Sequence, residues 1–185
     1  MKILVSLSAD RLPDSRRSDY VSDECNRHVL RSIGGIFVLF PGMRSWMRGV
    51  DYTLSTVSSV DPFDRKLVLS TNGLSGTVEE ANRIIAQSNK PGFCVHQERG
   101  LDALVVHEMA HAIDHWIRYE HRDDDEALTV YQNGKHVILK KLGPPSEYAR
   151  KNKQEQFAEQ FTLEYLGKGE RTLLNYLLGW RDRTR

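Results

Sequence analysis

Apolar positions in the first half of the chain fall in short runs that end at turn-forming residues. Such runs occupy residues 2–7, 36–40, 50–57, 66–70 and 93–96, and this pattern is typical of strands. A helix over residues 24–33 is expected to stop at Gly34-Gly35, because paired glycines commonly interrupt a helix. The first half is therefore predicted to supply most of the strands.

The second half has the period of amphipathic helices. Residues 101–119 carry apolar side chains three and four positions apart, which predicts a long helix. Pro144-Pro145 is a break, and Ser146 is expected to cap or precede a further helix that carries residues 155–166. Two more helices are predicted, one from Thr77 with Ala81, Ile84 and Ile85 on its apolar face, and one over residues 173–180. Strands followed by helices indicate the α+β class.

Length and charge narrow the possible functions. The 185 residues suit one domain over residues 1–185, with 39% apolar and 28% charged residues. Lys and Arg total 26 against 25 for Asp and Glu, so a net charge of +1 gives no reason to expect nucleic acid as a partner. The acidic run at residues 123–126 is expected to be a solvated loop, with a weak cation site as the alternative.

Two features bear on the cellular compartment. Cys25 and Cys94 lie far apart and in no paired ligand spacing, so no disulfide framework is predicted. The apolar stretch near the N-terminus is shorter than the roughly 7–15 residues of a signal peptide. No run approaches the roughly 20 apolar residues of a membrane span. The sequence therefore predicts a cytoplasmic protein, or one exported without a cleaved N-terminal signal.

The most informative motif is His107-Glu108-Met109-Ala110-His111. Residues four apart share one face of a helix, so the two imidazoles can converge on one ion, and zinc suits neutral imidazole. In this motif the glutamate reaches the water rather than the metal. The alternative is a helix with coincidental histidines, but the small and apolar residues at the other positions favour a buried active-site helix.

A third zinc ligand must come from elsewhere in the chain. His115 lies roughly 12 Å along the axis from His107, too far to share one ion. Asp114 is a better candidate to orient a ligand from behind. Glu155 and Glu159 lie one turn apart on a later helix, so one can bind zinc while the other accepts a hydrogen bond from a ligand histidine. The alternative is that both glutamates are simply solvated.

These segments resemble a known family. The stretch from His107 to Asp114, then Tyr148, then residues 155–161 are similar to the catalytic domain of anthrax lethal factor and to the bacterial Pro-Pro endopeptidases. The resemblance covers residues 101–166. It implies a small zincin-like fold with one zinc per chain, bound by His107, His111 and Glu155. It further implies that Glu108 is the base, that Tyr148 supports the oxyanion and that Glu159 holds the ligands from behind.

The resulting expectation is a zinc-dependent endopeptidase acting on a protein or peptide substrate. Zinc lowers the pKa of its water to about 7, and Glu108 takes a proton from that water and gives it to the leaving amine. Two other functions stay open: a zinc hydrolase acting on a non-peptide substrate, and a silent binding protein that zinc only stabilises. The sequence indicates neither the substrate sequence nor the oligomeric state.

Overall fold

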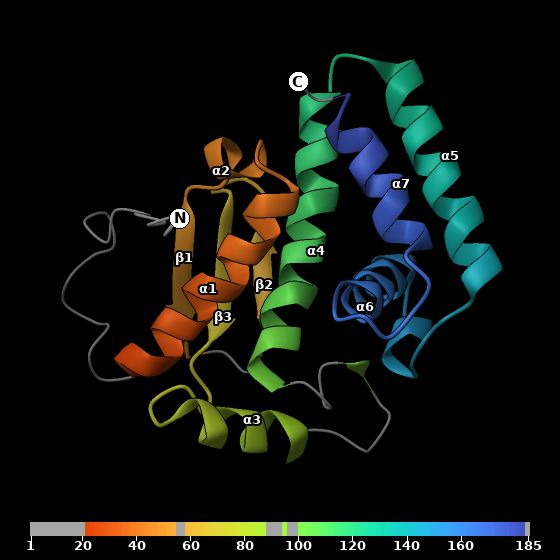
Figure 1. Cartoon of the computed structure of the whole chain (residues 1–185). Helices are drawn as coiled ribbons and strands as arrows, with labels where there is room; N and C mark the ends of the chain where they lie inside the picture. The colour runs from red at the N-terminus through yellow and green to blue at the C-terminus, as the bar shows by residue number, and fades with distance from the viewer. Residues whose placement is uncertain (1–20, 55–57, 88–93, 96–99, 184–185) are drawn as a thin grey trace.

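The computed structural model describes residues 21–54, 58–87, 94–95 and 100–183 (Figure 1). These residues form a small three-stranded sheet and a larger set of helices, which confirms the α+β class. In chain order the elements are α1 (Asp23–Leu39), α2 (Met43–Trp46), β1 (Gly49–Thr53), β2 (Ser59–Asp61), β3 (Lys66–Ser70), α3 (Val78–Gln87), α4 (Gly100–Glu120), α5 (Asp125–Leu142), the 3₁₀ turn η3 (Tyr148–Arg150), α6 (Lys153–Tyr165) and α7 (Thr172–Arg181).

The sheet has the order β1-β3-β2. β1 runs parallel to β3 and β2 runs antiparallel to it, with Val50 and Val60 both opposite Leu67. The predicted strand at 66–70 is confirmed, and β1 confirms the first part of the strand expected at 50–57, whereas β2 was not predicted. The strand expected at 2–7 lies outside the described residues, as do residues 55–57, 93 and 96 of two other expected strands.

Helix α4 is the centre of the molecule. It lies between α1 and the sheet on one side and the C-terminal helices on the other, with α3 across its N-terminal end (Figure 1). Val105, Met109, Ile113 and Trp116 are all buried, because neighbouring elements cover α4 on several sides. The predicted helices at 77 onward, 101–119, 155–166 and 173–180 are confirmed as α3, α4, α6 and α7.

Helix α1 corrects two predictions. It continues through Gly34-Gly35 to Leu39, so the expected break at the glycines and the strand at 36–40 are both wrong. A Cβ on Gly35 would lie 2.6 Å from the Tyr165 hydroxyl of α6, which shows that this glycine permits close approach of a neighbour. Buried Val29, Ile33 and Phe37 keep helical spacing across the pair, so packing decides the structure here.

Helix α5 was not predicted. It begins inside the acidic run: Asp124 is its N-cap and accepts a hydrogen bond from Ala127 N at 2.9 Å, while Asp125 and Glu126 form its first turn. The loop expected over 123–126 is therefore wrong for its second half, because carboxylates at a helix N-terminus satisfy free N–H groups. The break at Pro144-Pro145 is confirmed, since α5 ends at Leu142.

Among the described residues, no helix has both the length and the apolar character that crossing a membrane requires.

Candidate metal centre

The N-terminal end of α4 is fixed by α3. Leu101 N donates a hydrogen bond to Asn82 Oδ1 at 2.9 Å, which satisfies one of the free N–H groups of the first turn. Gly100 adopts a φ of 58°, and a Cβ there would lie 2.1 Å from Asn82 Oδ1. A side chain at this point would thus be strained by the backbone conformation and would crowd Asn82. This contact holds the start of α4, the helix that carries His107 and His111.

The start of α6 is fixed by its own N-cap. Asn152 Oδ1 accepts hydrogen bonds from Gln154 N and Glu155 N, both at 2.9 Å. Gln156 turns the other way and donates from Nε2 to Leu139 O of α5 at 2.8 Å. Glu155 is therefore held in the first turn of α6 with its side chain toward α4.

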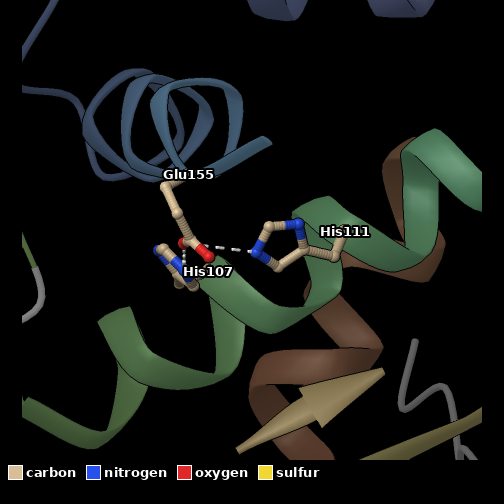
Figure 2. A group of neighbouring side chains, drawn as sticks. All are labelled: His107, His111 and Glu155. Carbon is tan, nitrogen blue, oxygen red and sulfur yellow. Dashed lines mark hydrogen bonds and ion pairs between the residues drawn. The ribbon is translucent and has the colours of Figure 1, made fainter. Parts of the chain in front are cut away.

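Three side chains from these two helices converge (Figure 2). Glu155 Oε2 lies 3.1 Å from His107 Nε2 and 3.6 Å from His111 Nε2. One ligand atom from each residue lies within 4.8 Å of the other two, which is the spacing of a set that can hold one ion. In the described part of the chain this group has three members, two imidazoles and a carboxylate.

The three side chains differ in exposure. The His107 side chain is 4% exposed, whereas those of His111 and Glu155 are 19% and 18% exposed. An ion held there would be more deeply buried on the His107 side than on the side of His111 and Glu155. Catalytic zinc sites keep three protein ligands and one open position, whereas structural sites are closed by four.

Glu159 lies behind His107. Its Oε1 is 3.1 Å from His107 Nδ1, and the side chain is fully buried. A carboxylate at Nδ1 favours a proton on that nitrogen and leaves the Nε2 lone pair for a metal. Burial lowers the pKa of His107, but hydrogen bonds with Glu155 and Glu159 outweigh it and raise the pKa to about 9. The two carboxylates thus favour positive charge at this position.

Glu108 is a third carboxyl group in the same environment. It is buried, and burial raises its pKa, opposed by the nearby His107 and His111. The like charge of Glu155 raises the pKa of Glu108 further. A carboxyl group with a raised pKa can both accept and return a proton near neutral pH.

Tyr148 lies beside these residues on η3. Its ring centroid is 6.0 Å from that of His107. Burial raises the pKa of Tyr148 to about 12, with additional contributions from Glu155 and Glu108. The phenol is therefore protonated at neutral pH and can act as a hydrogen-bond donor.

Asp114 has different partners from those expected. Its Oδ1 accepts hydrogen bonds from Tyr131 OH at 2.7 Å and from Lys135 Nζ, both on α5, and its Oδ2 lies 3.2 Å from Arg118. These contacts direct the carboxylate toward α5. His115, which was placed outside the site, has its Nδ1 3.0 Å from Arg118 of the same helix.

The donor set fits zinc. Neutral imidazoles and a carboxylate are its usual protein ligands at catalytic sites. The charge also fits, because Glu108, Glu155 and Glu159 gather around two imidazoles, and a bound cation would compensate this surplus of carboxyl groups.

The family model for the anthrax toxin lethal factor N- and C-terminal domain matches residues 74–176, more than half of the chain. The chain belongs to this family. The lethal factor match begins just ahead of α3 and extends into α7, so it covers every element that positions the three converging residues. No curated protein and no solved structure matches the chain.

Two supporting contacts were not predicted from the sequence. Ser146 Oγ and Val95 N both donate hydrogen bonds to Glu159 Oε2, at 2.7 Å and 2.6 Å. Ser146 precedes η3 rather than capping α6, whose cap is Asn152. Asn152 was detectable, since an asparagine just before a helical pattern is a common start signal. The contacts of Val95 and Ser146 depend on tertiary folding and have no local signal.

Proposed function

We propose that the protein is a zinc-dependent endopeptidase. The observation that carries the proposal is the convergence of His107, His111 and Glu155 next to the buried carboxyl of Glu108. The side chains of His111 and Glu155 are more exposed than that of His107. A purely structural zinc site needs no acid–base group beside its ligands and is closed by four of them. This arrangement therefore supports a hydrolytic centre more than a stabilising one.

Each residue has a role that its environment supports. His107, His111 and Glu155 would bind the zinc, and Glu159 would hold His107 in the tautomer that leaves Nε2 available. Zinc bound there supplies a Lewis acid for water and for the substrate carbonyl. Glu108 accepts a proton from the attacking water and passes it to the leaving amine. Tyr148, protonated at neutral pH, donates a hydrogen bond to the developing oxyanion.

Membership of the lethal factor family agrees with this proposal but does not assign catalysis by itself, because the family description covers both an N- and a C-terminal domain. The residues that would carry the chemistry lie within the matched segment, which favours a catalytic domain. A zinc hydrolase with a non-peptide substrate would use the same residues, so the experiment must separate the two activities.

The test combines zinc content with cleavage of a mixed peptide library. We expect about one zinc per chain in the wild type and in Glu108→Gln, since Glu108 is not among the ligands. Peptide cleavage should fall by about 10³-fold or more in Glu108→Gln, because the acid–base group is lost while the shape is kept. Glu120→Gln, an exposed residue at the end of α4, is the matched control and should cleave as the wild type does.

The outcomes separate the possible functions. Zinc binding with no cleavage by the wild type would contradict the peptidase, and a screen of ester and amide substrates would then test the non-peptide hydrolase. Equal cleavage by wild type and Glu108→Gln would contradict the role of Glu108. A protein that binds no zinc would contradict the whole proposal.

A further inference from the structure

The buried carboxylate of Glu159 contacts three separate parts of the chain. Its Oε1 lies 3.1 Å from His107 Nδ1 of α4. Its Oε2 accepts hydrogen bonds from Val95 N, in the segment before α4, and from Ser146 Oγ, in the segment before η3. Because Glu159 is itself on α6, one side chain connects both helices of the metal centre to the two segments beside it.

The hydroxyl of Ser146 acts both as a hydrogen-bond donor and as a hydrogen-bond acceptor. The hydroxyl donates to Glu159 Oε2 at 2.7 Å and accepts a hydrogen bond from Ala149 N at 3.0 Å. A serine hydroxyl has one donor and can accept at the same time, so a single group satisfies both contacts. Ala149 is buried and directly follows Tyr148 in η3. The hydrogen-bonded path therefore runs from the carboxylate behind His107 to the backbone next to Tyr148.

The turn that carries Tyr148 is short. Within η3, Arg150 N donates to Glu147 O at 3.1 Å and Lys151 N donates to Tyr148 O at 3.0 Å. Such i→i+3 bonds shape the turn, but they do not tie it to α4 or α6. Short 3₁₀ turns have weaker hydrogen-bond geometry than α-helices, so the place of the turn depends on contacts with its surroundings. The bond from the Ser146 hydroxyl to the Glu159 carboxylate is charge-assisted and joins the segment before this turn to α6.

We propose that Ser146 is a positioning residue. Its hydroxyl holds η3, the turn that carries Tyr148, in place by donating a hydrogen bond to the buried carboxylate of Glu159. This inference rests on the proposed peptidase function, in which Tyr148 acts on the substrate. The hydroxyl of Ser146 bonds to Glu159 and to Ala149 N, so Ser146 acts through other residues rather than on the metal centre directly. Its removal moves Tyr148 and leaves the ligand set in place, because Glu159 keeps its contacts with Val95 and His107.

The kinetic test compares Ser146→Ala, Ser146→Thr and Tyr148→Phe with the double variant Ser146→Ala/Tyr148→Phe. We expect Ser146→Ala to lower kcat about tenfold with KM changed less than about twofold, since a misplaced catalytic group costs rate rather than binding. Ser146→Thr keeps the hydroxyl and should restore most of the rate. In the Tyr148→Phe background, Ser146→Ala should cause no further loss. Ser45→Ala is the control, because Ser45 is exposed and its hydroxyl donates to Gly42 O of its own turn.

A second readout needs neither metal nor activity. With 3-fluorotyrosine in place of tyrosine, the ¹⁹F resonance of Tyr148 is identified by its loss in Tyr148→Phe. In metal-free protein, Ser146→Ala should shift or broaden that resonance, whereas Ser146→Thr and Ser45→Ala should leave it close to the wild type. This signal reports the environment of Tyr148 directly.

Two results would overturn the role proposed for Ser146, and a third would overturn only the peptidase function. An equal loss of kcat in the wild-type and Tyr148→Phe backgrounds would overturn the proposal, because Ser146 would then act through another residue. An unchanged Tyr148 resonance in Ser146→Ala would overturn it as well. If the wild-type protein cleaves no peptide, the proposed function fails, and the fluorine signal still decides whether Ser146 positions Tyr148.

Discussion

Two buried polar clusters share helix α4, and they differ in how their charges are compensated. In one, the carboxylate of Asp114 meets Lys135, Arg118 and the hydroxyl of Tyr131. Burial raises the pKa of Asp114, but the charges of Lys135 and Arg118 outweigh it and hold the pKa below its ordinary value. This cluster has two cations for one anion, and its compensation comes entirely from protein side chains.

The second cluster, around His107 and His111, has the opposite balance. Glu108, Glu155 and Glu159 supply three carboxyl groups for two imidazoles. The comparison indicates that the Asp114 cluster joins α4 to α5, whereas the histidine cluster is suited to a cation from outside. Residue types in the sequence do not separate these two roles, because both clusters place acids and bases on the same helix.

The largest expected difference between the clusters is their response to zinc. At free zinc of 1,000 times Kd, the free energy of unfolding should rise by about 4 kcal/mol over the metal-free protein. Glu155→Ala should lose most of this increment, whereas Asp114→Asn should keep it. Urea unfolding with zinc and with a chelator measures both. An increment that disappears in Asp114→Asn would show that the two clusters are not independent.

The next largest effect is expected in the metal-free protein. Asp114→Asn leaves Lys135 without its buried partner, so the free energy of unfolding should fall by about 3 kcal/mol. Asp51→Asn is the matched control, because Asp51 pairs with Lys66 at 2.8 Å near the surface. That change should cost less than about 1 kcal/mol. Equal effects for the two variants would contradict the structural importance assigned to the Asp114 cluster.

A smaller effect is expected from two glutamates of α6. Glu159→Gln should weaken zinc binding by about 10- to 100-fold, because it changes the group that orients His107. Glu164 is an equally buried control on the same helix, and it accepts hydrogen bonds from Leu173 N and Leu174 N at the start of α7. Glu164→Gln should lower stability by about 1 kcal/mol and leave zinc affinity within about twofold. Competition with a zinc-binding dye would measure the affinities.

The smallest effect concerns pH. Because the folded pKa of Asp114 is lowered, its contribution to stability is complete above the unfolded pKa of about 4 and is lost as the pH falls through the folded value. The stability difference between wild type and Asp114→Asn should therefore shrink as the pH falls below about 4. A difference that grows below about pH 4 would contradict this assignment.

Helices α3, α4, α6 and α7 could be predicted from the sequence, because each presents an apolar face that its neighbours bury. His107 and His111 were predicted as ligands because they lie one turn apart on a helix. The spacing on the later helix left Glu155 and Glu159 as alternatives, and the family resemblance singled out Glu155. Helix α5 was missed because its buried side chains, Tyr131 and Leu139, are widely spaced on a polar helix. Its attachment depends instead on polar contacts such as that of Lys135 with Asp114, which the sequence does not reveal.

The wrong break at Gly34-Gly35 and the undetected contact of Ser146 have a common cause. A Cβ on Gly35 would crowd the distant hydroxyl of Tyr165, and Ser146 donates a hydrogen bond to the distant carboxylate of Glu159. In both cases the role of a residue is decided by a side chain that only the folded chain brings near. Local pattern can therefore suggest a break or a cap, but it cannot identify the partner.

The contact between Asn82 and the first turn of α4 bears on how this domain can be inherited or divided. The sequence motif of His107, His111 and Glu155 fits within residues 101–166, yet that segment excludes Asn82, whose side chain caps the helix that carries the histidines. A fragment that is transferred to another protein or expressed on its own keeps this contact only if it extends upstream to include α3. Recombination within residues 83–100 would separate the motif from the residue that caps its helix.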